Sequence, residues 1–171
     1  MFATKSYIKY PHIIIKHFKD AQEEYFINVN DLNEILRIKN DLDLDYLEGA
    51  IYLTYKNQIL IDFCHYDMVD QLWAYFMNMI EEFLETKNSE MSFPDQPTPI
   101  SMDCISDDYI LFAIGFTQWK LPKYEFFKAL LLGAKDFFEK MILILEEKDK
   151  SYQFQLKRIK LLEQKINTLK Q

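Results

Sequence analysis

One short stretch of the chain, IDFCHYD, gathers side chains that could perform acid–base or nucleophilic chemistry: Asp62, Cys64, His65 and Asp67. A cysteine nucleophile needs a histidine base within hydrogen-bond reach, but neighbouring residues of a strand point to opposite faces of a sheet. We therefore do not expect Cys64 and His65 to form such a pair, and we predict that a nearby aspartate holds His65. An enzyme of unrecognised type that uses Asp62, His65 and Asp67 stays open as an alternative.

A second set of carboxylates, Asp41, Asp43 and Asp45, resembles the opening of a calcium-binding loop. Such a loop needs glycine at its sixth position and glutamate at its twelfth, where this chain has Tyr46 and Tyr52. Alternation of aspartate with leucine is also typical of a half-buried strand whose carboxylates face water. Walker loops, HExxH, CxxC pairs and Rossmann glycines are missing from the sequence. We predict no metal site, no cofactor and no catalytic residue.

The two cysteines, Cys64 and Cys104, lie in apolar, strand-like runs. Two free thiols in a reducing cytosol are favoured over a single buried disulfide, which stays the alternative. Lysine, proline and histidine interrupt the first residues, so no apolar stretch of signal-peptide length is found there. No run reaches the roughly 18 apolar residues that a membrane span needs. The sequence predicts a cytoplasmic protein that does not associate with membranes.

The net charge of −7 is distributed unevenly over the 171 residues. Residues 20–108 contain 20 Asp and Glu against four Lys and Arg, which is a net charge of −16, whereas residues 1–19 carry +4 and residues 109–171 carry +5. This acidic surplus argues against nucleic acid as the main ligand and favours a basic partner or a cation. Ordinary solubilising charge is the alternative explanation.

Two helices and two hairpins should position these residues. Apolar residues recur at steps of three and four over 67–87, which predicts an amphipathic helix with Asp67 as its N-cap, and 122–147 is helical and apolar round much of its surface. Alternating patterns predict hairpins over 50–65 and 100–116. The predicted fold class is α+β: an antiparallel sheet of about five to seven strands, covered on one face by both helices. Shorter elements are expected as strands at 7–18, 25–29 and 90–93 and a helix from Asn30.

A last helix is predicted over residues 150–171. Its apolar positions follow a near-heptad spacing, and they are Tyr152, Ile159, Leu162, Ile166 and Leu169. We favour folding back on the preceding helix over pairing with a second copy. The expected organisation is a single α+β domain over 1–148, followed by a helix over 149–171 that packs on it or dimerises, which leaves monomer and homodimer open.

Residues 47–140 contain three marks of a structural kind. They are the Asp70-Gln71-Leu72-Trp73 entry to a helix, the Phe93-Pro94-Asp95-Gln96-Pro97 turn, and Ala129, Gly133-Ala134-Lys135 and Phe138 on a later helix. With the order hairpin, helix, turn, hairpin, helix, this segment resembles small, largely uncharacterised bacterial α+β proteins associated with toxin-immunity loci. The resemblance implies a toxin-neutralising function and carries over no active-site residue.

We therefore expect a stoichiometric binding protein, of the immunity or inhibitor type, that neutralises a basic protein partner such as a toxin domain. The missing catalytic motifs, the acidic middle segment and the resemblance support this expectation, and nucleic acid and membranes are not expected partners. A scaffold or assembly subunit that dimerises through the last helix is the alternative. The expected contact residues are carboxylates in exposed turns: Asp41, Asp43, Asp45, Asp95, Asp107 and Asp108.

Overall fold

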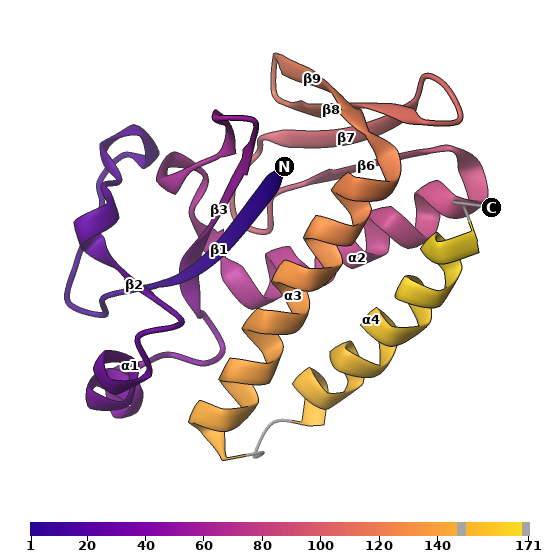
Figure 1. Ribbon diagram of the computed structural model, residues 1–171. Helices are drawn as coiled ribbons and strands as arrows, with labels where there is room; N and C mark the ends of the chain where they lie inside the picture. The colour runs from indigo at the N-terminus through magenta and orange to yellow at the C-terminus, as the bar shows by residue number, and fades with distance from the viewer. Residues whose placement is uncertain (147–149, 169–171) are drawn as a thin grey trace.

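The strands of the protein form two antiparallel sheets (Figure 1). The structure is a computed structural model in which residues 1–146 and 150–168 are described. The first sheet has the order β2-β1-β3-β4 with β5 paired to β3, and the second has the order β6-β7-β8-β9. The strands are β1 (Phe2–Lys9), β2 (Phe26–Asn28), β3 (Glu48–Tyr55), β4 (Gln58–Ile61), β5 (Asp67–Met68), β6 (Asn88–Ser92), β7 (Pro99–Cys104), β8 (Tyr109–Ile114) and β9 (Thr117–Pro122).

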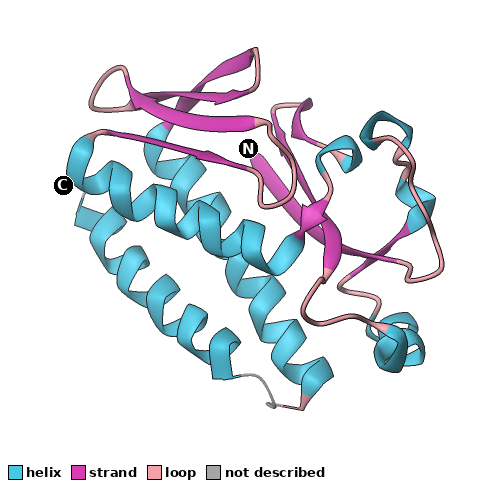
Figure 2. Ribbon diagram, turned by 180° about the vertical axis from the view of Figure 1, so that it is seen from behind, coloured by secondary structure: helices cyan, strands magenta, loops and turns pink. Residues whose placement is uncertain are grey.

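Within the described residues, three long α-helices and one short α-helix accompany the sheets (Figure 2). The central one, α2 (Val69–Thr86), contacts strands of both sheets, while α3 (Lys123–Leu145) and α4 (Lys150–Asn167) lie alongside it. The short helix α1 (Leu32–Ile38) contacts α3. The α+β class with antiparallel strands and a C-terminal helix is confirmed, with the strands divided between two sheets. None of the described helices has the length and apolar content that a membrane crossing requires.

The apolar period of α2 is confirmed, because its apolar positions are buried between the two sheets and α3. Trp73 is fully buried, and its Nε1 donates a hydrogen bond of 3.0 Å to Oγ of Ser6 on β1. Gly133 of α3 lies against the same indole, since a Cβ built at Gly133 would come within 2.6 Å of the Trp73 ring. Two marks of the resemblance, Trp73 and Gly133, therefore meet in the core.

The first sheet is covered on its other face as well. The aromatic side chains of Tyr7, Phe26, Phe63 and Tyr66 pack together there and are buried. Short 3₁₀ turns at Phe18–Asp20, Glu23–Tyr25 and Phe63–His65 accompany this cluster. Because both faces are buried, a strand of this sheet shows no simple alternation of apolar and polar residues.

The apolar side of α4 packs within its own chain, against α3 and α2. Tyr152, Ile159, Leu162 and Ile166 are buried, whereas Leu169 and the boundary predicted at 148 lie outside the described residues. Polar contacts reinforce the packing: Arg158 bonds Oδ1 of Asn78 at 2.8 Å and Oε2 of Glu81 at 3.1 Å on α2. Folding back on the preceding helix is the arrangement observed.

Several predicted boundaries were wrong. The strand predicted at 7–18 is β1 at Phe2–Lys9, because Pro11 cannot donate to a ladder and the chain turns there. In the first hairpin, Ile59 is 50% exposed while Leu60 is buried, because the register between β3 and β4 shifts between Leu53 and Thr54. The helix from Asn30 has Asp31 as its N-cap instead, and the strand β9 before α3 was not predicted.

Candidate functional site

The predicted contact residues Asp41, Asp43 and Asp45 lie in one exposed turn that follows α1. This segment is not the half-buried strand that its alternation suggested. Oδ1 of Asp43 instead accepts hydrogen bonds from the backbone N–H groups of Asp45, at 3.0 Å, and Tyr46, at 3.3 Å. The turn also presents two apolar side chains that sequence reasoning had not selected, with Leu44 exposed by 44% and Tyr46 by 59%.

A hollow of about 140 Å³ lies beside this turn, and Asp41, Asp43, Tyr46 and Glu48 are among its lining residues. Lys9 also lines it, with a side chain only 7% exposed that forms a 3.0 Å ion pair with Glu48. Nζ of Lys9 donates a second hydrogen bond of 2.6 Å to the Ile13 carbonyl. The Nζ group of Lys9 therefore already has an ion-pair partner and a hydrogen-bond partner, and within the described residues no cation pairs with the three aspartates of the turn.

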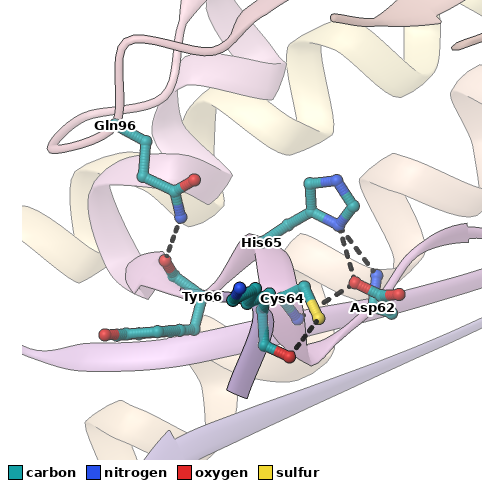
Figure 3. A network of polar contacts seen from close by, with 6 residues as sticks. Asp62, Cys64, His65, Tyr66 and Gln96 are labelled. Carbon is teal, nitrogen blue, oxygen red and sulfur yellow. Dashed lines mark hydrogen bonds and ion pairs between the residues drawn. The ribbon is translucent and has the colours of Figure 1, made fainter. Parts of the chain in front are cut away.

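The fourth predicted residue, Asp95, lies in the turn between β6 and β7, which is anchored to β5. Its backbone N–H donates to both carboxylate oxygens of Asp67, each at 3.0 Å. Nε2 of Gln96 donates to the Tyr66 carbonyl at 2.7 Å (Figure 3). Burial raises the pKa of the Tyr66 phenol, and the charges of Glu48, Asp67 and Asp95 raise it further. Asp67 lies opposite Gly49, the neighbour of Glu48, in the β3–β5 pair, so the hydrogen bonds to Asp67 place the Asp95 backbone in the same acidic region as Glu48.

Asp67 was predicted as the N-cap of α2, and this prediction was wrong. The N-cap is Met68, with no side-chain cap, and Asp67 belongs to β5. The Asp67 side chain is buried, which raises the pKa of its carboxyl, although the hydrogen bonds from Asp95 and Met68 oppose this shift. The carboxylate thus ties the β6–β7 turn to the first sheet.

The raised pKa of Asp67 predicts a pH-dependent contribution to stability. A carboxyl whose pKa is higher in the folded state than in the unfolded state favours folding most when it is protonated. The stability that Asp67 contributes is therefore fully present below about pH 3.8, and it is lost as the pH rises through the pKa of the folded state. The free energy of unfolding of the wild type should therefore fall relative to that of Asp67→Asn over this window. Urea titrations from about pH 3 to about pH 7 measure the difference.

Asp62 supplies the matched control, because its pKa is shifted in the opposite direction. Its hydrogen bond with His65 lowers the pKa of the Asp62 carboxyl, so the contribution is present above the unfolded-state value and lost as pH falls through the folded-state value. The wild type should gain stability relative to Asp62→Asn as pH rises. The same slope for both variants would contradict the assignment of opposite shifts.

The remaining two predicted residues, Asp107 and Asp108, belong to the turn between β7 and β8, and these strands lie at the opposite end of the molecule from α1 (Figure 1). The Asp108 carbonyl accepts a 2.8 Å hydrogen bond from N–H of Lys123, the first residue of α3. At the other end of α3, Lys39, just before Asp41, pairs with Glu146 at 3.2 Å. A helix of 23 residues is about 35 Å long. Asp107 and Asp108 therefore do not belong to the acidic region around the 41–48 segment.

The candidate acid–base cluster forms a self-contained turn (Figure 3). Nδ1 of His65 lies 2.8 Å from Oδ1 of Asp62, which also accepts the Cys64 N–H at 3.0 Å. The segment is a 3₁₀ turn and not a strand, yet the Cys64 thiol and the His65 ring still point apart, with Sγ 3.8 Å from the Lys19 carbonyl.

The environment of Cys64 does not activate its thiol. Burial raises the pKa of the thiol, with further contributions from Asp62 and Asp20, so the reactive thiolate is disfavoured. Cys64 and Cys104 are both free, as predicted, but both are half-buried and do not lie fully in the core. The His65 ring stacks on Phe93, with ring centroids 5.8 Å apart. This arrangement stabilises the turn before β5. Within the described residues, no group of three or more His, Cys, Asp or Glu could hold a metal ion.

Comparisons of the chain with protein-family models, with curated proteins and with solved structures gave no match. The resemblance to immunity-locus proteins stays a prediction that rests on the residues of the 47–140 segment.

Proposed function

We propose that this protein is a stoichiometric binding protein of the immunity or inhibitor type, which neutralises a basic protein partner through the acidic turn at 41–46. The turn combines three aspartates that lack an ion pair within the described residues with the exposed side chains of Leu44 and Tyr46. This combination is the observation that carries the proposal, because interfaces use tyrosine as an anchor surrounded by complementary polar groups.

The charge distribution supports the same proposal through association kinetics. Carboxylates on one surface accelerate the encounter with a basic protein and fix its orientation, whereas burial of an aromatic anchor slows dissociation. Asp95 and the partly neutralised Glu48 extend the negative surface beyond the turn. The proposed contact does not include Asp107 and Asp108, because they lie about one helix length away from the turn.

A homodimeric scaffold is the second candidate, and the outer side of α4 favours it. Phe154 and Leu161 are exposed by 59% and 58% on that helix. The near-heptad face of α4 packs against α3 and α2 of the same chain. A dimer that forms through α4 would therefore have to use these two exposed residues. Light scattering on the wild type and on Phe154→Ser/Leu161→Ser distinguishes the candidates: a dimer that the double substitution dissociates supports the scaffold, and a monomer in both supports the binding protein.

The binding proposal predicts that charge reversal of the turn weakens partner binding at least about tenfold, mainly through a slower association rate. The full chain, immobilised at low salt, should retain a basic protein from its native host in a one-to-one complex. Asp41→Lys/Asp43→Lys/Asp45→Lys is then compared with the wild type by surface plasmon resonance. Tyr46→Ala should also weaken binding by about tenfold, through faster dissociation.

Asp107→Lys/Asp108→Lys is the matched control, because it changes the net charge in the same direction at the other end of α3. This variant should keep nearly all of the affinity, apart from a small long-range effect that salt removes. The proposal is contradicted if no basic protein is retained at low salt, or if the control variant loses as much affinity as the variant of the turn.

A further inference from the structure

A second surface feature, a hollow of about 240 Å³, lies between α2 and β6. Met79, which is buried, and Tyr75 and Met91, which are half-buried, supply its apolar part. Methionine side chains are flexible and polarisable, and such surfaces adapt to the aliphatic stems of other side chains. The other lining residues are Asn78, Glu82 and Glu90.

The strand beside this hollow has an open edge. Among the described strands, β6 pairs only with β7. The residues just outside the two ends of β6 both form hydrogen bonds across to β7: the Lys87 carbonyl accepts from the Cys104 N–H, and the Phe93 N–H donates to the Thr98 carbonyl. The register between the strands is regular, so the odd-numbered residues of β6 also direct their backbone N–H and C=O groups toward β7. Because the direction alternates along a strand, Glu90 presents its N–H and C=O at the outer edge. An open edge of this kind can pair with an extended segment of another chain.

The charges around the hollow determine which segment fits. Glu82 and Glu90 are exposed, and within the described part of the chain neither forms an ion pair. Glu81, next to Glu82, is neutralised by Arg158 at 3.1 Å and Lys165 at 3.5 Å, and Arg158 also holds Asn78. The two unneutralised carboxylates therefore lie on either side of an apolar floor, and they complement a cationic side chain with a long aliphatic stem.

We propose that the edge of β6 binds an extended, basic segment of the protein partner by adding it to the second sheet as a further strand. Neighbouring side chains of that segment point to opposite faces. One lysine or arginine lies opposite Glu90 on the outer face, and the next lies over Met79 and Met91 with its charged head at Glu82. This inference rests on the proposed function for the basic character of the partner, but it concerns a different surface.

The test uses the full-length protein and a short capped peptide in which two adjacent lysines interrupt a run of threonine and valine. Amide resonances of Asn88–Ser92 and of the Tyr75–Glu82 part of α2 should shift in a saturable manner when the peptide is added to ¹⁵N-labelled protein. Glu82→Gln and Glu90→Gln should each weaken the affinity about threefold, and together about tenfold. Added salt should weaken binding to the wild type as well.

Glu85→Gln is the matched protein control, because Glu85 is exposed on α2 and does not line the hollow. A peptide with glutamine in place of both lysines should bind at least about tenfold more weakly. A peptide methylated on the backbone nitrogens that face β6 should not bind, because it cannot pair as a strand. Shifts that map elsewhere, an equal loss in Glu85→Gln, or full binding of the methylated peptide would each overturn the inference.

The two proposals fail separately. In the first case, Glu82→Gln/Glu90→Gln leaves peptide binding unchanged, while charge reversal of Asp41, Asp43 and Asp45 abolishes binding of the retained basic protein. The proposed function is then supported, and the proposed site at the edge of β6 is contradicted. If the peptide binds at β6 as described but no basic protein is ever retained by the full chain, the proposed function fails and the β6 edge remains a binding site for basic segments.

Discussion

Gly49→Ala should destabilise the protein by about 3 kcal/mol or more, because the added methyl group has no space and its nearest neighbour is backbone. A Cβ built at Gly49 would lie 2.1 Å from the Tyr7 carbonyl oxygen and 2.8 Å from Cγ1 of Val69. The first contact belongs to β1, paired with β3 at this point, and the second belongs to the start of α2. Relief requires β1 or α2 to move, which disturbs the core on both sides of the strand. Urea unfolding followed by circular dichroism measures the loss.

Gly115→Ala is the control for this prediction, because it adds the same methyl group at a position where the expected loss of stability has a different physical cause. Gly115 has a φ of +55° in the turn between β8 and β9, and the nearest atom to its added Cβ lies 3.8 Å away. Only the strain of a left-handed backbone applies there, which costs about 1 kcal/mol. If both variants lose the same small amount of stability, Gly49 is not a point of close approach between β1, β3 and α2.

The parts of the fold that follow from local periodicity were predictable from the sequence. The apolar positions of α2 recur within one helix, and the alternation of Ile110, Phe112 and Ile114 lies within one hairpin. Each pattern therefore indicates the type of its element and the buried side without reference to distant residues. The first strand was misplaced because its burial depends on distant partners. β1 pairs with β3 and β2, and Ser6 is buried through its contact with Trp73, none of which a local pattern can indicate.

The candidate site was predictable in its residue types but not in its grouping. Asp41, Asp43 and Asp45 were expected to be exposed, either in a turn or on the water-facing side of a strand, because aspartate is frequent in turns and mostly exposed. That Asp107 and Asp108 lie at the far end depends on the direction and length of α3, which the sequence does not relate to the 41–48 segment. Likewise, Asp67 looked like an N-cap because it precedes the helix, yet both oxygens of its carboxylate accept from the N–H of Asp95, 28 residues away.

Trp73→Ala should destabilise the protein by about 3–5 kcal/mol. Trp73 is fully buried where α2, α3 and the first sheet meet, so removal of its indole leaves a cavity between three elements that cannot all close over it. Gly133 permits α3 to approach the Trp73 ring closely. Without the ring, α3 loses the surface against which it packs at this position. The variant should unfold at a much lower urea concentration, as followed by far-ultraviolet circular dichroism.

The hydrogen bond to Ser6 can be separated from the packing by a double-mutant cycle. Trp73→Phe leaves the buried Ser6 hydroxyl without its donor and Ser6→Ala leaves the indole N–H without its acceptor, so each single change should cost about 1–3 kcal/mol. The double variant contains neither orphaned group, and it should lose less stability than the sum of the two single losses. Strict additivity would mean that the 3.0 Å contact contributes nothing. Trp73 would then hold α2 against β1 by packing alone, and the buried Ser6 in β1 would have no role in positioning the helix.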